Sequence, residues 1–255
     1  MTEPLKAWLE ADGRLLRLRL ARPKANLVDA AMIAALDAAL DAHLERPLVS
    51  AVLLDAEGPS FSFGASVEEH LPGACAAMLG NLHGLLGRML ESPVPILVAV
   101  HGRCLGGGLE LALAGHLMFV TPDAELGQPE IKLGVFAPAA SCLLPELIGP
   151  QRAFDLLISG RSISGSEAVA LGLAAAASID PQQAALDYFL KHLQPKSAQS
   201  LRHAVRAARQ ELAGRVRTRL AAVERLYLDE LMQTHDAVEG LSAFIEKRTA
   251  RWEHR

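Results

Sequence analysis

The strongest constraint on this chain is a glycine-rich turn between an apolar run and a helical segment, within residues 98–114. The run Val94–Val100 is predicted to be a buried strand. The segment after Gly106–Gly108 is predicted to be a helix that carries Glu110 in its first turn. Glycine lets backbone N–H groups approach a ligand closely, and N–H groups at a helix start have no intrahelical acceptor. The turn is therefore expected to bind an anion, or a carbonyl oxygen that becomes one.

Three common glycine-rich motifs do not match this turn. A Walker A loop ends in Gly-Lys-Ser/Thr, whereas Gly108 is followed by Leu109. A dinucleotide fingerprint needs G-x-G-x-x-G, which the spacing from Gly102 to Gly106 does not give. An HGGG-type oxyanion loop of a hydrolase requires a G-x-S-x-G elbow, which the sequence lacks. On this stretch alone, a tight turn without a ligand remains the alternative.

The composition is that of a globular chain. Of the 255 residues, 51% are hydrophobic and 21% charged, and the formal net charge is -4, which disfavours disorder and nucleic-acid binding. Cys75, Cys104 and Cys142 are scattered, which predicts packed, reduced thiols without metal ligation. We expect a cytoplasmic protein, because residues 1–12 lack the apolar core of a signal peptide and no run is long enough to span a membrane.

Alternating strand and helix signals predict an α/β layer fold. Strands are predicted over residues 16–20, 49–54, 94–100 and 117–121, and helices over residues 30–44, 74–90, 153–158 and 166–171. Asp29 and Ser164 are expected to be N-caps of two of these helices. Only helical spacing remains after Pro195, so we divide the chain into a core over residues 1–195 and a helical region over residues 196–255.

The helical region carries an apolar stripe with arginines between its members. The stripe consists of Leu201, Val205, Ala208, Leu212, Val216, Leu220 and Val223. An isolated chain would expose such a stripe to water, so we expect it to be an association surface. The arginines are interpreted as a solvated face.

Five phrases, met in order along nearly the whole chain, carry a family resemblance. They are Arg22–Asn26, Phe61–Ser66, His101-Gly102-x-x-x-Gly-Gly-Gly-x-Glu110, Gly127-Gln128-Pro129-Glu130 and Glu239–Arg248. Together they resemble the enoyl-CoA hydratase/isomerase (crotonase) family. The resemblance implies a spiral of ββα units followed by a C-terminal helical region that builds trimers, often paired into hexamers.

The resemblance also implies a hydro-lyase that acts on acyl-CoA thioesters. The N–H groups of Ala65 and Gly107 would form an oxyanion hole, and Glu110 and Glu130 would hold the water that is added. Which glutamate is the acid and which the base is left open. Contacts to CoA or substrate are expected from Lys24, Ala25, Phe63, Ser66, Val67, Phe136 and Lys247. No metal is implied, and no cofactor besides the CoA of the substrate.

Two departures from the family pattern concern the acyl group. Ser66 stands where an Asp is common, and Phe136–Ala140 replaces a glycine-rich turn, so a less charged site with a flat apolar wall is expected. Phrase-level resemblance around both segments implies a cyclic dienoyl thioester, as in anaerobic degradation of aromatic acids. The alternatives are a short-chain enoyl-CoA hydratase, an isomerase, and a crotonase-like binding or scaffold protein. His70 and His83 are further candidates for the pocket.

Overall fold

A six-stranded sheet forms the centre of the computed structural model, which describes residues 3–255. Its strands, in spatial order, are β1 (Leu5–Glu10), β2 (Leu15–Leu20), β3 (Ala51–Ala56), β4 (Ile96–Val100), β6 (Leu117–Val120) and β9 (Ala176–Ala177). β1 runs antiparallel to β2, and every later pair is parallel. The strands predicted over 16–20, 49–54, 94–100 and 117–121 are thereby confirmed to within two residues at each end.

A second, smaller sheet joins β5 (Arg103–Leu105), β7 (Glu125–Gly127) and β8 (Ser162–Ser164). An isolated parallel bridge adds Ser62 to β5 beside Cys104. The chain therefore repeats one strand in the large sheet, one strand or bridge in the small sheet, and then a helix. This is the expected spiral of ββα units.

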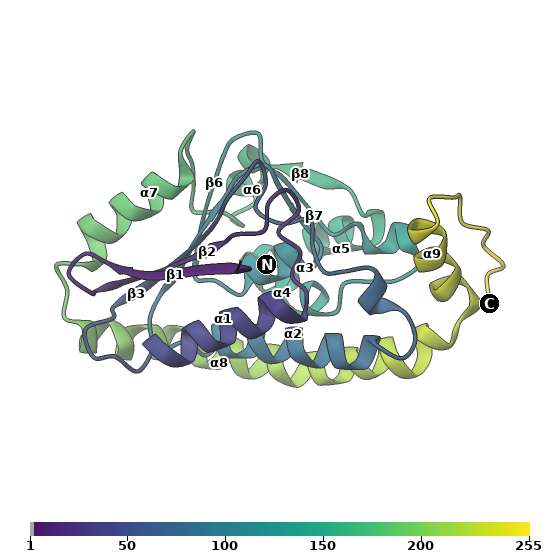
Figure 1. The fold of residues 1–255 in the computed structure, drawn as a ribbon, viewed down its shortest axis with the longest axis horizontal. Helices are drawn as coiled ribbons and strands as arrows, with labels where there is room; N and C mark the ends of the chain where they lie inside the picture. The colour runs from purple at the N-terminus through teal and green to yellow at the C-terminus, as the bar shows by residue number, and fades with distance from the viewer. Residues whose placement is uncertain (1–2) are drawn as a thin grey trace.

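The helices cover both faces of the large sheet. They are α1 (Ala30–His43), α2 (Cys75–Leu90), α3 (Gly107–Leu113), α4 (Pro138–Ile148), α5 (Pro150–Ser159), α6 (Gly165–Ala170), α7 (Pro181–Tyr188), α8 (Ala198–Arg225) and α9 (His235–Ile245). Figure 1 shows α1, α2 and α8 side by side below the sheet and α7 above it. Val52 and Leu54 pack in the core on the α1 and α2 side, whereas Leu53 joins the cluster under α7. Because both faces are covered, β3 is buried along its whole length.

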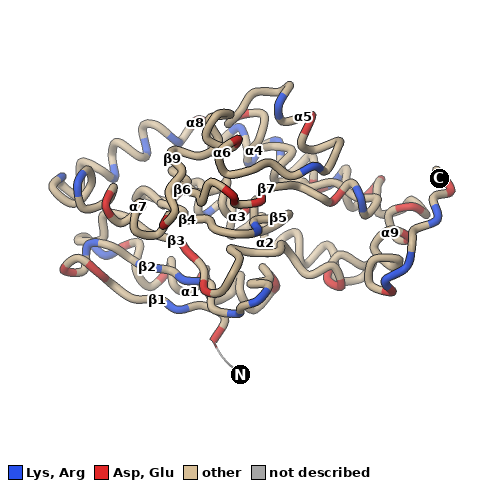
Figure 2. The backbone as a smooth tube through the Cα atoms, turned by 90° about the horizontal axis from the view of Figure 1, so that it is seen from above, with Lys and Arg blue, Asp and Glu red and all other residues tan. Residues whose placement is uncertain are grey.

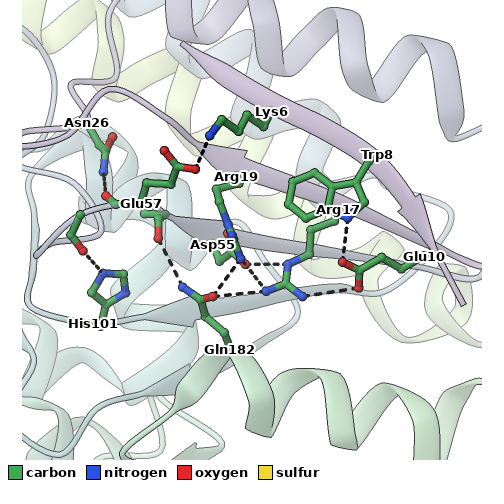
Figure 3. A network of polar contacts seen from close by, with 12 residues as sticks. Lys6, Trp8, Glu10, Arg17, Arg19, Asn26, Asp55, Glu57, His101 and Gln182 are labelled. Atoms are coloured by element: carbon green, nitrogen blue, oxygen red, sulfur yellow. Dashed lines mark hydrogen bonds and ion pairs between the residues drawn. The ribbon is translucent and has the colours of Figure 1, made fainter. Parts of the chain in front are cut away.

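A buried ionic network holds α7 on the sheet (Figure 3). The Asp55 carboxylate in β3 is fully buried and accepts hydrogen bonds from Nε of Arg17 and Nε of Arg19, both at 2.6 Å. Gln182 in α7 accepts from Arg19 at 2.9 Å. A buried carboxylate is tolerated when it is paired in this way, and removing one partner of such a pair costs about 3–5 kcal/mol.

Local capping follows the sequence. The Asp29 carboxylate accepts from the Met32 N–H at 2.9 Å, and the Ser164 hydroxyl accepts from the Glu167 N–H at 3.1 Å, which confirms both N-caps. The sequence does not predict α4 or the short strands β5, β7 and β9. Strands of two or three residues carry no periodicity, and α4 contains Pro145, which removes a backbone donor within the helix.

The apolar stripe of the C-terminal region corrects one expectation. Val216 and Leu220 of α8 are buried in the main core, against α2 and α4 of the same chain. Leu212 and Val223 pack against the same core, so the C-terminal half of the stripe is covered by the chain itself, whereas Ala208 stays exposed and Leu201 and Val205 are half-buried. The boundary between residues 195 and 196 stays a prediction, although α8 begins close to it, at Ala198.

Charges are mixed along the backbone (Figure 2). Several arginines of α8 pair with carboxylates, as Arg215 does with Glu146 at 2.8 Å and Arg217 with Glu91 at 2.6 Å. Within residues 3–255 no helix combines the length and the apolar character that crossing a membrane requires.

Candidate active site

The topology brings three separated segments to one edge of the small sheet. Ser62 bridges Cys104 in parallel, and Leu105 pairs with Gly127 in parallel. Since neighbouring parallel strands end at the same edge, the segments that follow them lie side by side. These segments are residues 63–66, residues 106–108 and residues 128–130, and they frame a cavity.

The glycine run of residues 106–108 is required by this close approach. A Cβ on Gly106 would lie 2.6 Å from Oε1 of Glu130, and one on Gly108 would lie 2.5 Å from the Ser62 side chain. A Cβ on Gly107 would lie 3.2 Å from the Ala65 nitrogen. Gly106 also has φ +50, which L residues rarely adopt. The glycine run therefore allows the three segments to pack closely against one another.

Two backbone donors face the cavity together. Ala65 and Gly107 both line it, and neither N–H has a hydrogen-bond partner among residues 3–255. Gly107 is the first residue of α3, where the helix itself offers no acceptor. Two such donors, fixed before a ligand arrives, can stabilise an oxygen that gains negative charge.

Hydrogen bonds from the first ββα unit hold the Ala65 segment. The Ser62 hydroxyl donates to the Asn26 carbonyl at 2.8 Å and accepts from the Gly64 N–H at 3.1 Å. The Phe63 N–H donates to the Ala25 carbonyl at 2.8 Å. Asn26 is fully buried, and its amide donates to the carbonyls of Glu57 and Ser60. The turn after β2 thus positions the Ala65 N–H.

Glu110 is a buried carboxylate bound to a helix start. It projects from α3 and is 3% exposed, and its Oε1 accepts from the Ala140 N–H at 2.8 Å. Pro138 begins α4, so Ala140 lies in the first turn, where N–H groups lack intrahelical partners. The segment Phe136–Ala140 therefore supplies a donor to Glu110. Burial raises the pKa of Glu110, and this hydrogen bond opposes the rise.

Glu130 is the second carboxylate of the cavity. It lies in a 3-10 turn, Pro129–Leu133, and its solvent-accessible part lines the cavity. The buried side-chain amide of Gln128 donates to both carboxylate oxygens at 3.1 Å when the amide nitrogen faces Glu130. Burial, and next the negative charge of Glu110, raise the pKa of Glu130 to about 8. Both causes favour the protonated form of Glu130.

The remaining walls of the cavity are apolar. They include Val67, Leu79, Leu82, Leu133, Val135, Phe136 and Leu241, together with His70. The Phe136 ring packs edge-on against Tyr227, with 5.2 Å between centroids. His70 is tied by Nδ1 to the Ser66 carbonyl at 2.8 Å, and burial lowers its pKa. An imidazole with a lowered pKa and a flat aromatic ring therefore both line the cavity.

The structure brings together most of the residues expected at the site. Those that line the cavity are Phe63, Ala65, Val67, Gly107, Glu110, Glu130 and Phe136. Ser66 does not, because its hydroxyl donates to Glu68 at 2.9 Å. Lys24, Ala25 and Lys247 also lie outside the cavity lining, and the two lysines are exposed. His83 is not in the lining either, since its Nδ1 lies 2.5 Å from Oε2 of Glu224.

Three residues at or beside the cavity had no role predicted from the sequence. Gln128 lies within a quoted phrase but received no role, and Ala140 acts through its backbone, which no side-chain pattern reveals. Tyr227 reaches the acyl wall only through tertiary packing. No cluster of three or more His, Cys, Asp or Glu side chains suited to a metal ion exists in residues 3–255.

Comparison with known proteins decides the family. The model of the enoyl-CoA hydratase/isomerase family matches residues 10–255. The chain belongs to the enoyl-CoA hydratase/isomerase family. The earlier resemblance is thereby confirmed over almost the whole chain.

Individual relatives and solved structures support the same family. A cyclohexa-1,5-dienecarbonyl-CoA hydratase of Thauera aromatica is 64% identical over 254 residues, covering 100% of this chain and 98% of the relative. The crystal structure of an enoyl-CoA hydratase/isomerase from Xanthobacter autotrophicus has a TM-score of 0.85 at 25% identity and covers 99% of each chain. That of an enoyl-CoA hydratase from Mycobacterium avium subsp. paratuberculosis has a TM-score of 0.85 at 23% identity over 98% of each chain, which shows the shared fold.

Proposed function

We propose that this protein hydrates cyclohexa-1,5-diene-1-carbonyl-CoA to a hydroxycyclohexene-carbonyl-CoA. The observation that carries the proposal is a pair of carboxylates, the buried Glu110 and the half-buried Glu130, beside two unpaired backbone donors in one cavity. The 64% identity to a cyclohexa-1,5-dienecarbonyl-CoA hydratase supports the cyclic substrate.

The chemistry assigns a part to each group. The N–H groups of Ala65 and Gly107 would bind the thioester oxygen and stabilise the dienolate that forms when water adds. Glu130, whose raised pKa favours the protonated acid, would give its proton to a ring carbon. Glu110 would accept a proton from water while the water oxygen bonds to carbon. One water is consumed, one C=C bond is lost, and the proton returns from Glu110 to Glu130.

The apolar walls suit a ring. Phe136 offers a flat face to one side of the acyl position, and Val67 and Leu133 complete the enclosure. The CoA moiety would extend out of the cavity past Phe63. The Phe63 side chain is exposed, and the guanidinium carbon of Arg103 lies 5.4 Å from the centroid of its ring. Ala25 contacts this residue through its carbonyl, which supports a role for Lys24 and Ala25 at the mouth. Lys247 would contact CoA of a neighbouring subunit.

An exposed apolar patch supports assembly into a homotrimer or homohexamer. Phe154 and Ile158 of α5 are 60% and 71% exposed, and Ile131 is 41% exposed. Ile131 lies beside the C-terminal end of α5, because a Cβ on Gly160 would lie 2.8 Å from the Ile131 side chain. Exposed apolar patches of this kind mark interfaces. Ile131 follows Glu130 directly, so association there would brace the catalytic turn.

Three buried, free thiols support a cytoplasmic location.

The direct test follows the absorbance of the unsaturated thioester during incubation with the protein. The wild-type protein should hydrate the cyclic dienoyl thioester, and Glu110→Gln and Glu130→Gln should each lower turnover by about 10²–10⁴. Glu211→Gln, on the surface of α8, is the matched control and should have no effect. A product with a shifted double bond and no added water would instead indicate an isomerase. No reaction at all would indicate a binding protein.

A further inference from the structure

Tyr227 is a fully buried tyrosine whose hydroxyl has no hydrogen-bond partner among residues 3–255. Buried polar groups in native proteins are almost always paired, with protein atoms or with ordered water. The neighbours of Tyr227 in its cluster are mainly apolar and include Cys75, Met78, Leu79, Val135 and Leu241. The hydroxyl therefore has no structural partner that would explain why tyrosine, and not phenylalanine, stands here.

The backbone at Tyr227 is also irregular. The residue lies in a π-helical turn, Leu226–Glu230, that directly continues α8. π-Helical turns are rare and occur frequently at functional sites. The turn carries the Tyr227 ring to the edge of Phe136, which lines the acyl cavity.

The Tyr227 ring packs in one cluster with residues that line the cavity of both carboxylates, among them Val67, Val135 and Leu241. Burial is the main cause of a raised pKa for Tyr227. The phenol consequently keeps its proton at neutral pH and is a hydrogen-bond donor. The carboxylates of the cavity accept from Ala140 and Gln128, which leaves Oε2 of Glu110 without a donor among residues 3–255.

We propose that Tyr227 is a positioning residue, whose O–H donates through one bridging water to the Glu110–Glu130 carboxylate pair and favours its ionised forms. This inference rests on the proposed hydratase function and adds a third polar group to its site. The other ionisable groups around the phenol and the pair are Cys75 and His83 of α2, His70, and Glu224 of α8. None of them supplies a donor to Glu130.

Tyr227→Phe tests the proposal, because it removes the hydroxyl and keeps the ring. The loss of a donor to a carboxylate should raise both apparent pKa values of the coupled pair by about one unit. The bell-shaped profile of kcat/KM should therefore move to higher pH. At a fixed pH on the acid side activity should fall about tenfold, and at a fixed pH on the alkaline side it should rise by a similar factor. KM should stay unchanged.

The chain offers a matched control in its other tyrosine. Tyr188 packs against Phe119 on the opposite face of the sheet, and Tyr188→Phe should leave the profile unmoved. The Tm of Tyr227→Phe should not fall, since no protein partner of the hydroxyl is lost. A profile that superimposes on an active wild type would overturn the inference and leave the hydratase function intact. A lowered Tm with a matching loss of activity at every pH would overturn it as well, because it would show a purely structural role. An inactive wild type would refute the proposed function itself.

Discussion

Gly106→Ala, in the glycine-rich turn, should lower kcat strongly in a protein that still folds. The new Cβ would lie 2.6 Å from Oε1 of Glu130, well inside contact distance, and nothing but that side-chain end is close enough to clash. The carboxylate can swing away at little steric cost, so the fold should survive. However, a displacement of about 1 Å at a catalytic group can cost about 10²-fold in rate.

The backbone adds a second, independent cost. Gly106 has φ +50 and ψ -131, a conformation that alanine adopts only under strain of about 1–3 kcal/mol. For a chain of this length, 1 kcal/mol lowers Tm by about 2–4 °C. We therefore expect a Tm reduced by several degrees, together with a kcat reduced about 10²-fold and a KM changed much less.

Gly172→Ala provides the control for strain alone. Gly172 has φ +79, and a Cβ there would meet nothing within 4 Å. This variant should lose stability similarly and retain full kcat, with unfolding followed by circular dichroism and turnover by thioester absorbance. If Gly106→Ala keeps wild-type kcat at a temperature where it is folded, the close approach of Glu130 to the turn is not needed for catalysis.

Two further outcomes are expected. The pKa of Glu130 rises from 4.5 to about 8 on folding, so the folded protein binds a proton that the unfolded chain releases in this interval. The corresponding stability is fully present below about pH 4.5 and is lost as pH rises to about 8, by at most about 1.4 kcal/mol per pH unit. Glu130→Gln should abolish this slope in chemical denaturation, and an unchanged slope would mean that Glu130 is not buried as a neutral acid. Ile158→Asp should shift sedimentation toward the monomer, whereas Ile179→Asp, at a position 93% exposed outside the patch, should not. Equal behaviour of the two variants would exclude the α5 patch as an interface.

The long elements and most residues that line the cavity could be predicted from sequence because local signals carry them. The strand β3 and the helix α2 have clear apolar patterns, and Glu110 follows a run of glycines whose purpose is close packing. The glycine positions also indicate which backbone N–H group, that of Gly107, lies at the cavity. In these places local chemistry and tertiary structure agree.

Other features depend on contacts that no local pattern encodes. An apolar stripe looks the same whether a partner or the chain itself covers it, so the burial of Val216 could not be foreseen. The Ser66 side chain was expected near the acyl group, but a hydrogen bond to Glu68 directs it away. The Ala140 N–H can donate to Glu110 only because α4 begins at Pro138. That helix start was not predicted from the sequence. Tertiary context decided each of these cases.

Direct competition between two substrates tests the central claim. The purified protein would receive cyclohexa-1,5-diene-1-carbonyl-CoA and crotonyl-CoA at equal concentration, and the loss of each would be followed separately by chromatography. Because Phe136 and the apolar walls favour a ring, the cyclic dienoyl thioester should be consumed first, with one water gained per product. A clear preference for crotonyl-CoA would contradict the cyclic substrate and leave a general enoyl-CoA hydratase in its place.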